Sequence, residues 1–200
     1  MHQTEQKRYS KTTALVLCGI FAALMAICSF ITIPLGFTPV PINLATLGVF
    51  LTGGILGKKY GSISLIVYIL LGAVGVPVFA GFKGGLGVLA GPTGGYIIGY
   101  LVAAFLTGLL VELVFTKTGT DSGQRSAKSS TSRFIGIILA MIAGLAACYA
   151  LGTAWFMIST GTGLGAALIS CVIPFLPGDA AKIIVGALLV QKLRPAIPIR

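Results

Sequence analysis

Two residues have the types and spacing best suited to chemistry, Asp179 and Lys182 in the segment FLPGDAAK. Residues three apart lie on one face of a helix, so the carboxylate and the ammonium group can pair or bind a polar ligand together. A helix that begins near Pro177 would place Asp179 in its first turn, where the helix dipole favours a carboxylate. Asp179 could therefore also be a helix cap, with Lys182 merely its partner.

A second candidate is the glycine-rich segment 80–95, AGFKGGLGVLAGPTGG. Glycine at this density disfavours a continuous helix and lets the backbone approach a ligand or another helix closely. The phosphate-binding pattern GxxxxGK[ST] is absent from it. We expect a lid or a pocket wall, with Lys83, Gly91 and Thr93 among the binding residues; a merely flexible turn is the alternative.

The composition indicates what kind of protein positions these residues. Apolar residues make up 56% of the 200 residues and charged residues 9%. The mean hydropathy is +1.02, whereas soluble domains carry about 25% charged residues. We therefore expect an all-α integral membrane protein, a single membrane domain over residues 1–200. Charges within such a bundle face its interior or a water-filled cavity, which favours a binding role for Asp179 and Lys182.

Six membrane-spanning helices are predicted, each about as long as a hydrocarbon core requires. Charged residues and Pro34, Pro39 and Pro41 separate the apolar stretches, which gives approximate spans 13–33, 41–57, 60–79, 92–115, 134–156 and 177–193. The polar segment 116–133 is expected to be a flexible cytoplasmic loop.

The basic residues predict the orientation of these spans. The chain has 14 Lys and Arg against 4 Asp and Glu. With a cytoplasmic amino terminus, all of the fourteen except Lys83 and Lys182, that is twelve, fall in cytoplasmic segments. Because Lys and Arg accumulate on that side, both termini are predicted to be cytoplasmic, in a multi-pass protein of the cell membrane. No soluble basic face is left for nucleic acid.

Nothing in the sequence has the pattern of an enzyme. The single histidine is His2, and neither an HExxH motif nor a nucleophile elbow occurs, so we expect no catalytic residue, cofactor or metal. Trp155 is a predicted interfacial anchor. Aromatic side chains chosen by position alone are predicted to form the pocket walls: Phe79, Tyr96 and Tyr149.

The first span carries a stripe of small residues at four-residue spacing: Ala14, Cys18, Ala22 and Ala26. Small residues permit close approach between membrane helices. The stripe could pack within the chain; we expect it to face outward, toward a partner.

Three segments closely resemble signature segments of BioY, the biotin-binding S component of energy-coupling-factor (ECF) vitamin transporters. They are FTPVPINLATLGVFLTGGILGKKYG, GAVGVPVFAGFKGGLGVLAGPTGGYIIGY and IPFLPGDAAKIIVGALL. The resemblance covers nearly the whole chain. It implies the six-helix ECF S-component fold, a pocket open to the outside and high-affinity capture of biotin for uptake. It also implies a transmembrane T component and two ABC-type ATPase subunits as partners, bound through Ala22 and Ala26.

One position departs from the family's pattern. Where the family has Gln within PITLQT, this chain has Ala45, so Asn43 or Thr46 would have to supply the missing polar contact. Asp179 and Lys182 suit the ureido group of biotin, although Lys182 could instead meet its carboxylate tail. Two other functions remain alternatives: an S component for another vitamin, and a structural membrane protein in which the charged pair holds helices together.

Overall fold

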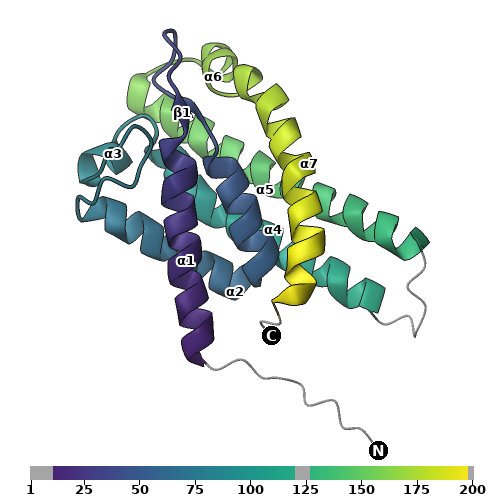
Figure 1. The fold of residues 1–200 in the computed structure, drawn as a ribbon. Coiled ribbons are helices and arrows are strands. Elements are labelled where there is room, and N and C mark those ends of the chain that lie inside the picture. The colour runs from purple at the N-terminus through teal and green to yellow at the C-terminus, as the bar shows by residue number, and fades with distance from the viewer. Residues whose placement is uncertain (1–10, 120–126, 198–200) are drawn as a thin grey trace, which may run out of the picture.

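The computed structural model describes residues 11–119 and 127–197, which form a bundle of long helices (Figure 1). The all-α class predicted from the composition is confirmed. In chain order the elements are α1 (Lys11–Phe30), β1 (Thr32–Ile33), β2 (Ile42–Asn43), α2 (Ala45–Ala73), α3 (Leu86–Ala90), α4 (Gly94–Gly119), α5 (Ala127–Thr160), α6 (Leu164–Cys171), the 3₁₀ helix η1 (Ile173–Phe175), α7 (Leu176–Leu193) and the 3₁₀ helix η2 (Arg194–Ala196).

The number of long apolar helices differs from the predicted number of spans. Five helices in the described part of the chain are long and apolar enough to cross a membrane. The difference lies in α2, which covers most of the predicted spans 41–57 and 60–79 in one run. Gly57 interrupts this run with a non-helical backbone (φ 77°, ψ −179°), a conformation that suits glycine because it has no β-carbon. Two arms of α2 therefore meet at a bend, and six membrane crossings stay a prediction.

Two boundaries follow from where the sequence favours or disfavours a helix. Pro34, Pro39 and Pro41 lie between α1 and α2, and there the chain forms the antiparallel β1–β2 pair instead, as proline disrupts helix interiors. The predicted loop 116–133 is shorter in the structure, because α4 continues to Gly119 and α5 begins at Ala127. Extending an existing helix costs less than starting one, so polar residues can prolong both helices. Residues 120–126 lie outside the described residues.

The two ends of the bundle differ in content (Figure 1). One end, which we call the pocket end, holds the β1–β2 pair, α3, α6 and the start of α7. The other, the basic end, holds the start of α1, the bend in α2 and the ends of α4 and α7. Its basic residues include Lys11, Lys58, Lys59, Lys192 and Arg194, together with Arg133 near the start of α5. This distribution agrees with the predicted charge asymmetry, while the side of the membrane that each end faces stays a prediction.

Helix α4 is central, because it packs extensively against both α2 and α5. Its approach to α2 requires glycine, since a β-carbon on Gly53 would overlap the carbonyl group of Ala104. Toward the basic end the core is apolar, and Phe50, Ile137 and Val190 are each at most 1% exposed. A core of fully buried side chains holds the helices in fixed positions. It thereby also fixes the side chains that these helices carry at the pocket end.

The small-residue stripe on α1 does not face outward, contrary to expectation. Ala14, Cys18 and Ala22 are 5%, 3% and 4% exposed, and Ala26 is half-buried. Cys18 Sγ donates to the carbonyl oxygen of Tyr60 at 3.5 Å, so the stripe lies against α2. The small side chains serve close packing of two helices within the chain.

Candidate functional site

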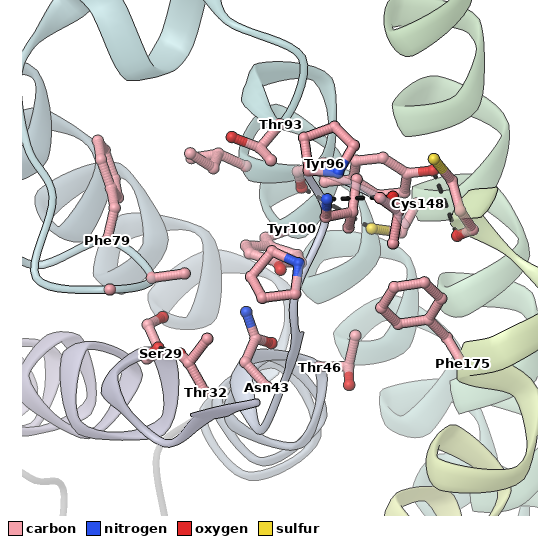
Figure 2. Close-up of a pocket in the computed structure, with 18 of the residues that line it drawn as sticks. Ser29, Thr32, Asn43, Thr46, Phe79, Thr93, Tyr96, Tyr100, Cys148 and Phe175 are labelled. Carbon is pink, nitrogen blue, oxygen red and sulfur yellow. Dashed lines mark hydrogen bonds between the residues drawn. The ribbon is translucent and has the colours of Figure 1, made fainter. Parts of the chain in front are cut away.

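A cavity of about 240 Å³ opens at the pocket end, between α1, α2, α4, α5 and α7 and the loops that join them. Figure 2 shows Phe79, Asn43, Tyr96 and Phe175 arranged around this space from separate segments of the chain. An apolar cavity with a few convergent polar groups is typical of a small-molecule site. The hydroxyl, amide and charged side chains that line it are Ser29, Thr32, Thr38, Asn43, Thr46, Tyr68, Lys83, Thr93, Tyr96, Tyr100, Tyr149, Asp179 and Lys182.

Asp179 and Lys182 form a buried ion pair in the wall of this cavity. They are 2% and 9% exposed, and Lys182 Nζ lies 2.8 Å from Asp179 Oδ1. Thr46 Oγ1 donates to the same carboxylate oxygen at 2.8 Å and accepts from Lys182 Nζ at 3.1 Å. The Tyr149 hydroxyl donates to Asp179 Oδ2. This network joins α2, α5 and α7 around one carboxylate.

The helix-cap interpretation of Asp179 does not fit this geometry. The N-cap of α7 is Phe175, without a side-chain capping bond, whereas Asp179 accepts from Thr46, Tyr149 and Lys182. A carboxylate has about four acceptor sites, and an ammonium group has three N–H donors. Beyond the bonds described, Asp179 therefore keeps acceptor capacity and Lys182 keeps a donor for a ligand in the cavity.

Polar groups on the α1 and α2 side of the cavity are also held by hydrogen bonds. Ser29 Oγ and Tyr68 Oη lie 2.8 Å apart. Asn43 Oδ1 accepts from the backbone N–H of Ala45 at 3.0 Å, at the start of α2. The amide nitrogen of Asn43 consequently points into the cavity (Figure 2), where it can donate to a ligand.

Nine of the ten binding residues predicted from the sequence line this cavity: Asn43, Thr46, Phe79, Lys83, Thr93, Tyr96, Tyr149, Asp179 and Lys182. Gly91 is not among the lining residues. Its carbonyl oxygen accepts a hydrogen bond from Trp155 Nε1 at 2.9 Å, so Trp155 holds the turn between α3 and α4. No sequence pattern predicts this contact, since a tryptophan near the end of a span indicates an anchor at the lipid interface.

Several lining residues were missed by the sequence reasoning. Ser29 and Tyr68 could have been found, because hydroxyl groups within apolar spans need a polar partner. Cys148 and Cys171, 2% and 1% exposed, could not, since a buried thiol looks like any small apolar residue in a sequence. The missed residues are Ser29, Thr32, Thr38, Tyr68, Tyr100, Cys148, Cys171 and Phe175, together with apolar positions of the loops, Val88 of α3 and Ile97 of α4.

Ala45, the position that departs from the family pattern, does not line the cavity. Ala45 is 0% exposed, and its neighbour Thr46 makes the polar contacts to Asp179 and Lys182. Across residues 11–119 and 127–197, no three His, Cys, Asp or Glu side chains come together as a metal site would require.

The chain is similar in sequence and in fold to known proteins. A sequence model of the BioY family matches residues 2–199. The chain is 39% identical over 181 residues to the biotin transporter BioY of Thermotoga maritima, a match covering 90% of this chain and 95% of that protein. It is 36% identical to the biotin transporter BioY of Rhizobium etli, with 94% and 96% covered. A crystal structure of the S-component for biotin from an ECF-type ABC transporter is similar in fold, with a TM-score of 0.77, 33% identity and 92% of each chain covered. The chain therefore belongs to the BioY family, and its fold is that of an ECF S component.

Proposed function

We propose that this chain binds biotin in the cavity at the pocket end and serves as the substrate-binding subunit of a biotin uptake system in the cell membrane. One observation carries the proposal: a buried carboxylate–ammonium pair, with bonding capacity left over, lies in the wall of an otherwise mainly apolar cavity. Family membership supports the identity of the ligand, since the similar proteins carry the name biotin transporter.

The polar and apolar groups of biotin match the polar and apolar side chains that line the cavity. Its ureido ring offers two N–H donors and one carbonyl acceptor, its thioether ring is apolar, and its tail ends in a carboxylate. The Asp179 carboxylate has capacity to accept from one ureido N–H group while Lys182 donates to the ureido oxygen. A second carboxylate beside Asp179 would be repelled, so the tail instead points toward the exposed Lys83 at the opening. Phe79 and Phe175 then contact the apolar ring.

The partner proteins are a transmembrane T component and two ABC-type ATPase subunits, which supply the energy for uptake. Because Ala22 is buried against α2, a different face of α1 must meet them. Gly19 and Ala23 are exposed one turn apart, and a β-carbon on Gly19 would meet no atom within 4 Å. Small residues there leave room for a neighbouring membrane helix.

This partner surface has a matched test. Ala23→Trp should weaken assembly with the energising subunits and leave biotin binding unchanged, because its side chain points away from the bundle. Ala22→Trp should instead disturb the α1–α2 contact and lower the melting temperature. Normal assembly of a folded Ala23→Trp variant would rule out this face.

The ligand is tested by binding labelled biotin to the purified chain in detergent, with excess unlabelled biotin, thiamine or riboflavin as competitors. We expect displacement by biotin alone. Displacement by another vitamin would identify an S component of different specificity. An absence of binding to the folded chain would favour the structural alternative, in which the Asp179–Lys182 network only joins α2, α5 and α7.

A further inference from the structure

The loop between α2 and α3 contains a backbone conformation that the proposed binding site does not explain. Phe82 has a φ of 56°, and no other non-glycine residue of the described chain has a positive φ. The positive φ values nearby belong to glycines, Gly81 at 70° and Gly85 at 95°. A β-carbon is disfavoured in this left-handed region. Phe82 therefore occupies a position where the local backbone favours glycine.

The ring of Phe82 makes a contact that offsets this strain. It stacks on Phe30, with ring centroids 4.4 Å apart and planes 22° from parallel. Phe82 is otherwise 66% exposed, so burial in the core does not account for it. Stacked aromatic pairs are more stable than their buried area alone would give. Because Phe30 is the last residue of α1, the stack connects the loop to the end of that helix.

Phe30 and Phe82 are close in the chain to residues that line the cavity. The lining residues include Thr32, two residues after Phe30, and Gly81 and Lys83, which flank Phe82. The backbones of Phe79 and Lys83 pair through N–H···O bonds of 2.9 and 3.3 Å, so residues 79–83 form one closed turn. The Phe30–Phe82 stack thus connects two segments that contribute lining residues and come from separate parts of the sequence.

We propose that Phe82 is a positioning residue whose stack on Phe30 holds the 79–83 turn against α1 and limits how fast a ligand enters and leaves the cavity. When the rings separate, the turn moves away from α1 with Lys83, and the opening widens. The nature of the ligand rests on the proposed function; the movement of the turn does not.

A native thiol inside the cavity reports this movement without any ligand. Cys171 lines the cavity and is 1% exposed. The chain has 4 cysteines, so Cys171 is the sole thiol in a background that carries Cys18→Ala, Cys28→Ala and Cys148→Ala. The measured quantity is the rate at which a charged, water-soluble methanethiosulfonate modifies Cys171 in the detergent-purified protein.

Phe82→Gly should raise this rate about threefold to tenfold, the size that an aromatic pair provides. Glycine suits the left-handed backbone, so this variant removes the ring without adding strain to the turn. Phe82→Tyr keeps the ring and should keep the parent rate. Phe37→Gly is the matched control, because Phe37 is 65% exposed in the neighbouring loop between β1 and β2 and should change nothing.

Phe30→Ala should reproduce the effect of Phe82→Gly, and the double variant should be no faster than either, since both changes break one contact. Labelled biotin should dissociate from Phe82→Gly about threefold to tenfold faster and also associate faster, so that its Kd changes less than either rate. The proposal would be overturned if Phe82→Gly kept the parent rates of both Cys171 modification and biotin release. It would also be overturned if the effects of Phe82→Gly and Phe30→Ala were additive in the double variant. Faster Cys171 modification in a protein that binds no biotin would uphold the role of Phe82 and refute the proposed function.

Discussion

Each end of the molecule holds a lysine–carboxylate pair, and the two pairs differ in how deeply their side chains are buried. At the pocket end, Lys182 Nζ lies 2.8 Å from Asp179, and the side chains are 10% and 3% exposed. At the basic end, Lys58 Nζ lies 3.7 Å from Glu112, and the side chains are 46% and 34% exposed. Exposed pairs contribute about 0–1 kcal/mol to stability, whereas removing one partner of a buried pair costs about 3–5 kcal/mol.

The surroundings of each pair indicate what it does. Glu112 Oε1 accepts the backbone N–H of Lys58 at 3.0 Å, directly after the bend at Gly57, so this carboxylate satisfies a backbone donor that the bend exposes. Asp179 instead accepts from side chains of three helices and lines the cavity. The exposed pair therefore supports the fold locally, while the buried pair supplies polar groups for a ligand.

The largest effect is expected from Lys182→Met, which keeps most of the length of the side chain and removes its charge. The Asp179 carboxylate would stay buried without its counter-charge, at a cost of about 3–5 kcal/mol. Because 1.4 kcal/mol is tenfold in affinity, biotin binding should weaken by at least about two orders of magnitude. Size exclusion and thermal melting in detergent check that the variant folds, and a folded variant with parent affinity would contradict this role for Lys182.

The neighbours of the buried pair should give intermediate effects. Tyr149→Phe and Thr46→Val each remove a hydrogen bond to the Asp179 carboxylate, and a bond to a charged group contributes about 1.5–3 kcal/mol. Biotin affinity should fall by about tenfold or more in each variant, since the carboxylate is then less firmly placed. Equilibrium titration with labelled biotin measures this, and a Tyr149→Phe affinity equal to the parent's would remove that residue from the site.

At the basic end, Gly57→Ala should lower stability more than it lowers affinity. A β-carbon at this position would overlap Glu112 Oε1. The backbone of Gly57, with φ 77° and ψ −179°, costs other residues about 1–3 kcal/mol. The melting temperature should therefore drop measurably, while the biotin Kd of the folded fraction changes little. An unchanged melting curve would show that the bend tolerates a side chain.

The smallest effect is expected from Lys58→Ala. Only the exposed ammonium group is lost, and the backbone N–H of Lys58 still donates to Glu112, so stability should change by about 0–1 kcal/mol. Added salt screens exposed charges, so the difference between the parent and this variant should shrink as ionic strength rises. If Lys58→Ala lost several kcal/mol of stability even in high salt, the exposed pair would stabilise the fold as strongly as the buried pair, contrary to this prediction.

The sequence was most informative where a residue type carries a large energetic cost. A charged pair within apolar spans must face the bundle interior, and Asp179 and Lys182 do so for that reason. Glycine density in the segment 80–95 likewise indicated a wall of the cavity, and Lys83 and Thr93 line it. Gly91 does not, because the pattern of glycines gives no information on which side of the turn faces inward.

Features that depend on neighbouring helices could not be predicted in this way. Small residues such as Ala22 pack equally well against a helix of the same chain or of a partner. The sequence therefore does not determine which way the stripe on α1 faces, and the prediction that it faces outward is wrong. The charges of Lys58 and Lys59 predict a break between two spans, whereas the structure has a bend at Gly57 within α2. A glycine followed by two lysines has the same sequence pattern in both cases. The stack of Phe30 and Phe82 joins segments whose approach only the fold determines.

The most direct test of the central claim compares two matched substitutions, Asp179→Asn and Glu112→Gln. Each neutralises one carboxylate with almost no change of shape, one in the buried pair and one in the exposed pair. The measurement is the equilibrium Kd for labelled biotin of both folded variants beside the parent. We predict at least about a hundredfold weaker binding for Asp179→Asn and less than about a threefold change for Glu112→Gln. Parent affinity in a folded Asp179→Asn, or equal losses in both variants, would contradict this prediction.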